Sequence, residues 1–155
     1  MENSSNLSEL MRRGSEFLGV KYPILCGAMT WVSEPQLVSS VANAGGFGCL
    51  AGGNAPCDVL REQILRMRTL TDKPFAVNLI TIAPSYKEHL AMLAEIKVPF
   101  IIFAGSFPKE KEIEAAKATG AKVLCFASTI SIAERMIRFG ADGIILEGSE
   151  AGGHI

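Results

Sequence analysis

The residues with the clearest chemical potential lie together in the segment Glu147–Ile155. Gly152 and Gly153 allow backbone N–H groups to come close to an anionic or polar part of a cofactor. His154 follows them, and the ordinary histidine pKa of about 6.5 suits a general base near neutral pH. A structural histidine is the alternative. No other histidine or cysteine stands at ligand spacing from His154, so the segment predicts no metal site.

Polar or flexible residues also follow apolar runs earlier in the chain. Asn78 interrupts the apolar run 75–82, and a buried amide must find hydrogen bonds, either on neighbouring strands or on a polar ligand. The segment 52–56 (Gly-Gly-Asn-Ala-Pro) joins a predicted strand to a predicted helix and could line a ligand site. The segment 29–31 (Met-Thr-Trp) could face a planar ligand there, or pack under a loop.

Three other features are better explained by structural roles than by a functional site. His89 has lysine and glutamate beside it on a predicted helix, which indicates a solvent-exposed outer face. The segment 44–48 (Ala-Gly-Gly-Phe-Gly) precedes a strand, whereas a dinucleotide fingerprint follows one, so it predicts a helix end with Gly45 left-handed. The four cysteines are widely spaced and predict buried apolar side chains in a reducing compartment, without disulfides: Cys26, Cys49, Cys57 and Cys125.

The elements that would position these residues come from an alternation of apolar runs with helix-period segments. The apolar runs predict strands at 22–27, 47–52, 75–80, 100–104, 122–127 and 143–146. The segments between them predict helices at 34–44, 56–70, 85–95, 109–119 and 130–139. Strands that start 21 to 28 residues apart fit one strand and one helix per unit, with right-handed crossovers and a parallel sheet.

Two architectures cover both faces of such a sheet, an open doubly wound sheet and a (β/α)8 barrel. Each predicted strand ends in small or polar residues, which favours a barrel of the TIM type with its site at the carboxyl ends. Because a closed barrel needs eight strands, we expect an α/β partial (β/α)8 barrel of about six units at 15–155, after a polar segment at 1–14. The alternatives are a fragment of a longer protein, sheet edges covered by another chain, and an open sheet.

Composition narrows the classes of partner. The 155 residues include 15 basic and 16 acidic side chains, and a net charge of −1 does not favour nucleic acid or anionic lipid. No apolar stretch reaches the roughly 20 residues that span a bilayer, and no signal peptide is evident at the N-terminus. We therefore expect a cytoplasmic protein whose partners are small molecules, further copies of the chain, or a missing C-terminal segment.

Four blocks of the sequence, in order, resemble the nitronate monooxygenase family, also called 2-nitropropane dioxygenase-like. The blocks are Tyr22–Met29, Asn43–Gly48, Leu70–Asn78 and Glu147–Ile155. The resemblance extends from about Ser15 to the last residue. It implies an FMN-dependent (β/α)8 barrel, in a superfamily that includes the flavoprotein enoyl-acyl-carrier-protein reductase of bacterial fatty acid synthesis.

The resemblance also implies positions for the flavin. Ala28, Met29 and Thr30 would lie along it, Asn78 would hydrogen-bond its ring system, and Glu147 would lie near its ribityl side. The main phosphate site of the family comes from loops after strands seven and eight, as is common in barrels, and those units are not among these residues.

His154 matches the histidine of the family's Gly-Gly-His motif, which is the base for the carbon acid in nitronate and nitroalkane oxidation. The resemblance thus implies an FMN-dependent oxidoreductase that oxidises nitronates with O2. One alternative is the NAD(P)H-dependent enoyl reductase, to which Trp31 and the segment 52–56 look more similar. Another is an inactive fragment, or half of a barrel that needs a partner chain.

Overall fold

The structure is a computed structural model that describes residues 2–152, with the side chains of residues 6–152. Its helices are α1 (Glu2–Leu18), α2 (Pro35–Asn43), α3 (Cys57–Leu70), α4 (Tyr86–Ile96), α5 (Glu110–Ala118) and α6 (Ile130–Arg138). Its strands are β1 (Leu25–Cys26), β2 (Phe47–Ala51), β3 (Ala76–Ile80), β4 (Phe100–Ala104), β5 (Lys122–Ala127) and β6 (Gly143–Leu146).

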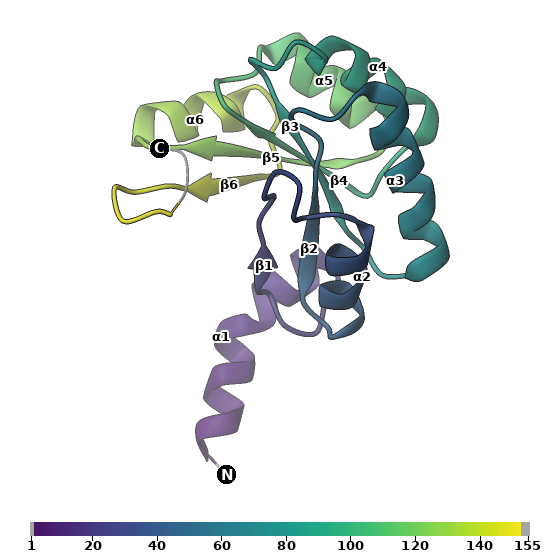
Figure 1. Cartoon of the computed structure of the whole chain (residues 1–155). Helices are drawn as coiled ribbons and strands as arrows, with labels where there is room; N and C mark the ends of the chain where they lie inside the picture. The colour runs from purple at the N-terminus through teal and green to yellow at the C-terminus, as the bar shows by residue number, and fades with distance from the viewer. Residues whose placement is uncertain (1, 153–155) are drawn as a thin grey trace.

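The strands form one parallel sheet in which their spatial order is their order in the chain, β1 to β6. A doubly wound sheet would reverse its strand order at a switch point, whereas a barrel adds each strand beside the previous one. The sheet curls with α2 to α6 on its outer side, as Figure 1 shows. The prediction of a partial (β/α)8 barrel is therefore confirmed, with six strands and five helices between them in the described residues.

Alternate residues of each strand belong to two separate apolar clusters, because successive side chains of a strand point to opposite faces. In β3, Val77 and Leu79 pack in the outer cluster with residues of the covering helices. Ala76 belongs to the inner cluster, and Asn78 lies on the same inner face of the strand. The predicted ligand-binding amide thus lies inside the curve of the sheet.

Helix α1 closes the inner cluster at the amino ends of the strands. The rings of Phe17 and Phe100 meet edge to face with their centroids 5.9 Å apart. Lys122 donates from Nζ to the Phe17 carbonyl at 2.5 Å, and its ammonium lies 4.7 Å from the Phe17 ring centroid. This helix was not among the predicted elements, and it extends across the expected boundary between residues 14 and 15.

The element boundaries differ from the predicted ones mainly at the first strand. The expected strand 22–27 is reduced to β1, because the Ile24 N–H bonds to the Tyr22 carbonyl at 2.8 Å and so forms a turn. As an edge of the sheet, β1 pairs with β2 alone. The predicted left-handed helix end at Gly45 is confirmed by its φ of 94°. Within residues 2–152, no helix is both long and apolar enough to cross a membrane.

Candidate functional site at the carboxyl ends of the strands

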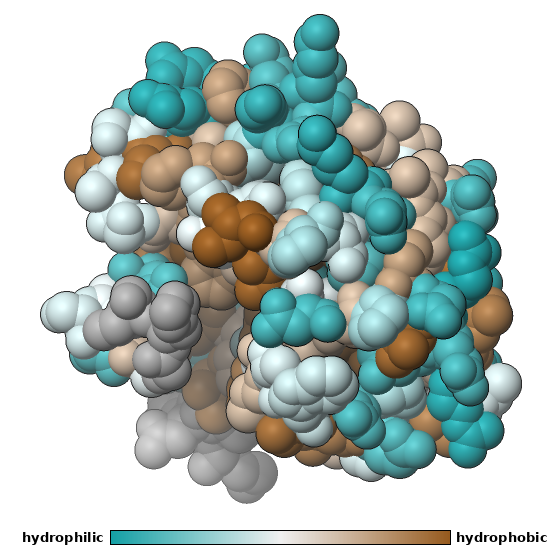
Figure 2. All heavy atoms as spheres, turned by 45° about the horizontal axis from the view of Figure 1, so that its top comes forward, coloured by the Kyte–Doolittle hydropathy of each residue, from teal (hydrophilic) through white to brown (hydrophobic). Residues whose placement is uncertain are grey.

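The predicted site lies at the edge of the sheet where the parallel strands end. Figure 2, in which the top of Figure 1 is turned forward, shows apolar side chains exposed among polar ones on one face. The large apolar side chains exposed on the loops and strand end at the carboxyl edge are Met29, Trp31, Val32, Ile82, Phe107, Ile130 and Leu146. Exposed apolar groups of this kind suit contact with a ligand or with further protein.

Ser33 fixes the loop that follows β1. Its side chain is buried, and its Oγ accepts the Met29 N–H at 2.9 Å and donates to the Gly27 carbonyl at 3.0 Å. The Ser33 carbonyl accepts the Ala51 N–H at 3.2 Å, which joins the loop to β2. Ser33 was not among the predicted site residues, although a hydroxyl just before a helix start often bonds to nearby backbone.

The three residues expected along the flavin lie on this loop. Ala28 packs against the inner cluster, whereas Met29 and Thr30 are exposed. Trp31 is 73% exposed and has a φ of 63°, a left-handed conformation that is strained for a bulky residue. The bend at Trp31 holds the indole out toward solvent beside the loop, so it does not pack beneath it.

Asn78 lies on the inner face of β3, in register with Ala51 of β2 and Ile102 of β4. It is 6% exposed, and its Nδ2 donates to the Ile102 carbonyl at 3.4 Å. A hydrogen bond of that length is weak. The amide therefore bonds to a neighbouring strand, which is one of the two alternatives predicted from the sequence. It still has capacity for a second polar partner.

The loop after β2 lies directly against the end of β3, and two glycines permit this approach. The Gly52 N–H bonds to the Asn78 carbonyl at 3.1 Å, and a Cβ on Gly52 would stand 2.6 Å from that oxygen. A Cβ on Gly53 would collide with Cγ1 of Ile80. The glycines thus let the loop pack directly on β3 beside Asn78. Contact of the segment 52–56 with a ligand stays a prediction.

Glu147 lies at the other end of the sheet, after β6. It is half-buried, and its N–H bonds to the Ala127 carbonyl at 3.4 Å. It lines a cavity of about 770 Å³ between the end of β6 and α6, which Ser128, Thr129 and Arg138 also line. Gly152 is exposed at the end of the described chain.

The predicted base is not placed by the structure. Gly153 and His154 lie outside the described residues. The structure therefore brings Ala28 and Asn78 to one inner face. Glu147 follows β6, three strands from β3 and five from β1, and the position of the base stays a prediction.

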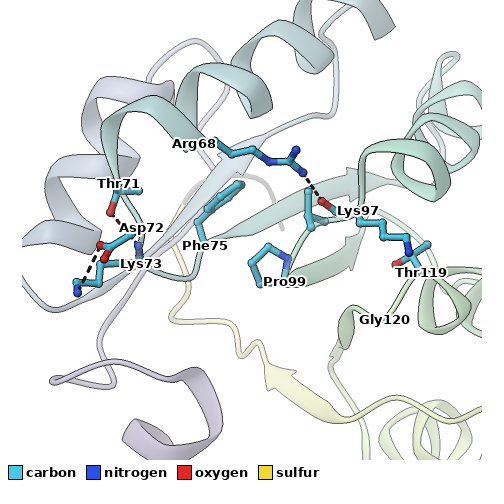
Figure 3. A pocket seen from close by; sticks show the side chains of 10 residues that line it. Arg68, Thr71, Asp72, Lys73, Phe75, Lys97, Pro99, Thr119 and Gly120 are labelled. Carbon is cyan, nitrogen blue, oxygen red and sulfur yellow. Dashed lines mark hydrogen bonds and ion pairs between the residues drawn. The ribbon is translucent and has the colours of Figure 1, made fainter.

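A second cavity, of about 500 Å³, opens at the opposite edge, near the amino ends of β3 and β4 (Figure 3). Arg68 extends along it and donates from Nη2 to the carbonyls of Ile96 and Lys97 at 2.5 and 2.7 Å. These bonds satisfy the end of α4. In barrels this edge serves stability while the carboxyl edge carries chemistry, so we assign a structural role to this cavity.

The prediction that His89 lies on a solvent-exposed face is wrong. The side chain is fully buried, and its Nε2 lies 2.9 Å from the Ala55 carbonyl oxygen. His89 stands three residues after Tyr86 and three before Met92, which are both buried, so it shares the inward face of α4. That spacing was the available signal, and the neighbouring charged residues obscured it.

The burial of His89 predicts a stability that depends on pH. Burial lowers its pKa below the ordinary value of 6.5, although the Ala55 carbonyl and Glu88 act in the opposite direction. The unfolded chain therefore binds a proton at a higher pH than the folded protein. This contribution to stability is complete above about pH 6.5 and is lost as the pH falls through the folded pKa.

We expect the urea midpoint of the wild-type chain to fall more steeply between pH 7 and pH 5 than that of His89→Leu, which lacks the titrating group. The comparison removes the contribution of carboxylates, which both chains share. Parallel pH profiles for the two chains would show that His89 does not titrate differently on unfolding.

The four cysteines differ in burial. Cys49 and Cys125 are buried, and burial raises the pKa of both thiols, while Cys26 and Cys57 are half-buried. Among the residues placed in the structure, no three histidine, cysteine or acidic side chains are arranged to hold a metal ion.

The chain is similar to known proteins of one family. The family described as nitronate monooxygenase matches residues 12–91 and 80–155. A (3aS,4S,5R,7aS)-5-hydroxy-7a-methyl-1-oxo-octahydro-1H-indene-4-carboxyl-CoA dehydrogenase of Rhodococcus jostii (strain RHA1) is 36% identical, over 96% of this chain and 42% of its own length.

Two solved structures share the fold and appreciable identity. FabK from Thermotoga maritima is 38% identical with a TM-score of 0.87, over 92% of this chain and 46% of its own. A nitroalkane oxidase from Streptomyces ansochromogenes is 29% identical with a TM-score of 0.83, over 90% of this chain and 49% of its own. The chain spans about half the length of these relatives. Since the family match covers nearly all of its residues, the chain belongs to the nitronate monooxygenase family.

Proposed function

We propose that this chain supplies the flavin-contacting residues and the base of an FMN-dependent oxidoreductase that oxidises nitronates and nitroalkanes with O2. The observation that carries the proposal is the juxtaposition of Asn78 with the loop 52–56 on the inner face of a partial barrel. Support comes from the family match and from the likeness to a nitroalkane oxidase.

The residues at this edge fit a planar, polar-rimmed cofactor. The Asn78 amide is buried and only weakly bonded, so it could hydrogen-bond a flavin ring edge. Gly52 and Gly53 are buried, and their lack of side chains lets the loop 52–56 pack directly on β3, so the exposed Asn54 lies close to Asn78. Ala28 and Met29 offer apolar contact along a ring face.

In this proposal each residue has a separate task. FMN, when bound, would supply two-electron redox chemistry. His154 would remove the proton from the carbon beside the nitro group, since a base of moderate pKa suits that transfer. Asn78 and the loop at Ala28–Thr30 would orient the ring system, and Glu147 would lie near the ribityl chain.

A specific observation favours a second candidate, an NAD(P)H-dependent flavoprotein enoyl-acyl-carrier-protein reductase. Met29, Trp31 and Val32 are 45%, 73% and 54% exposed on one loop of the carboxyl edge, which suits an acyl chain better than a small nitronate. The Rhodococcus relative is also named for a carboxyl-CoA substrate. An inactive half-barrel that needs a partner chain is the third candidate.

One set of measurements separates the candidates. We expect the purified chain to quench flavin fluorescence on titration with FMN, and Asn78→Leu to weaken that binding. Asn43→Leu is the control, because Asn43 is exposed at the end of α2, away from the carboxyl edge. O2 consumption with a preformed nitronate supports the first candidate, and NADH or NADPH oxidation with an enoyl thioester supports the second. A chain that binds no FMN and has neither activity would overturn both.

A further inference from the structure

His89 is an unusual residue for the outer helical layer of a barrel. It is fully buried on α4, on the same helix face as Tyr86, Met92 and Leu93. Burying an imidazole among apolar side chains is unfavourable unless its polar atoms are bonded. The bond of Nε2 to the Ala55 carbonyl satisfies one ring nitrogen, while Nδ1 has no hydrogen-bond partner among the described residues.

The Ala55 carbonyl determines which tautomer the His89 ring adopts. A carbonyl oxygen only accepts, so Nε2 of His89 must carry the hydrogen that it donates to Ala55. The neutral ring then leaves Nδ1 as an unused acceptor. His89 therefore acts as a one-point donor, aimed from α4 at the loop after β2.

The loop that His89 holds has a second attachment at its other end. The Gly52 N–H bonds to the Asn78 carbonyl at 3.1 Å, so the loop is fixed to β3 at residue 52 and to α4 at residue 55. Asn54, between these points, is exposed at the carboxyl edge. Because β3 runs into α4, one β-α unit determines the position of the preceding loop.

We propose that His89 is a positioning residue of the carboxyl edge, which holds the Ala55 carbonyl and thereby fixes the loop 52–55 beside Asn78, where cofactor or substrate would bind. The effect of this positioning on cofactor or substrate binding rests on the proposed function. The positioning itself depends only on the hydrogen bond and can be measured without a ligand.

The test compares His89→Leu, which keeps apolar volume but loses the donor, with His89→Gln, whose amide can donate at a similar reach. In the His89→Leu chain we expect the Gly52 amide to exchange hydrogen about 2- to 10-fold faster, the factor equivalent to one neutral hydrogen bond. Amides of β4 should keep their wild-type rates, and His89→Gln should restore most of the protection at Gly52. Tyr86→Phe is the matched control, because it alters the same helix face and leaves the Ala55 bond intact.

Flavin titration of the same chains gives the functional result. We expect FMN to bind about 2- to 10-fold more weakly to His89→Leu than to the wild type and His89→Gln. Unchanged Gly52 exchange in a folded His89→Leu chain would overturn the positioning role. Faster exchange with an unchanged FMN dissociation constant would overturn its link to the site. A wild-type chain that binds no FMN would contradict the proposed function, while the exchange rates would still decide the positioning.

Discussion

Replacing His154 by alanine is expected to lower turnover of a neutral nitroalkane about 10²- to 10⁴-fold, the range that a well-placed general base contributes. The carbon of a nitroalkane must lose a proton before electrons can leave it. A preformed nitronate has already lost that proton, so its oxidation should fall far less in the same variant. The ratio of the two rates therefore isolates proton removal from flavin chemistry.

Flavin content is the control for this variant. An active protein that carries His154→Ala should keep its FMN, as judged by absorbance per protein and by the flavin dissociation constant. An equal loss with nitroalkane and nitronate would show that the histidine has another task. Loss of the flavin would make it a structural or binding residue.

The Gly52→Ala variant is expected to be destabilised by about 1–3 kcal/mol, the usual range for forcing an extra methyl group into a packed site. The new Cβ would stand 2.6 Å from the Asn78 carbonyl oxygen and 3.0 Å from Cδ2 of Leu60. The carbonyl belongs to the backbone of a central strand, so the loop must move away. We expect Tm to fall by roughly 2–10 °C in a chain of this size.

Gly27→Ala is the matched control, since the Cβ added there meets nothing within 4 Å. Both glycines lie at the ends of neighbouring strands, so composition and helix content are unchanged between the two variants. If Gly52→Ala melts at the same temperature as Gly27→Ala, the loop after β2 can shift freely. Its close approach to Asn78 would then not be a fixed feature of the site.

The general plan of the fold was predictable because it is encoded locally. Apolar runs of strand length alternate with helix-period segments, and this alternation specifies a parallel sheet without reference to distant contacts. The small and polar strand ends, such as Asn78 and Gly52, indicated which edge would carry the site. The structure places both residues at that edge.

The errors came from features that only tertiary contacts determine. His89 looks exposed beside Lys87 and Glu88, and its burial follows from which face of α4 meets the sheet. Ser33 bonds to backbone on both sides of a loop whose path the sequence does not specify. The first strand is short because the backbone turns between Tyr22 and Ile24, a local bond that the apolar run does not reveal.

Helix α1 was missed because only its last turn contacts the sheet. Leu7 and Leu10 are exposed, whereas Phe17 and Leu18 pack in the inner cluster. The segment is polar on average and buries few side chains, so it does not look like part of a packed core, and its stability depends on residues far along the chain.

The bond between Lys122 and the Phe17 carbonyl joins residues 105 positions apart in the chain. During synthesis, this bond can form only after β5 has left the ribosome, whereas Phe100, the ring partner of Phe17, is made earlier with β4. Closing so long a loop is slow, and contacts of this kind form late in folding. Until β4 is made, Phe17 lacks its ring partner, so the last turn of α1 exposes apolar surface that a chaperone could bind.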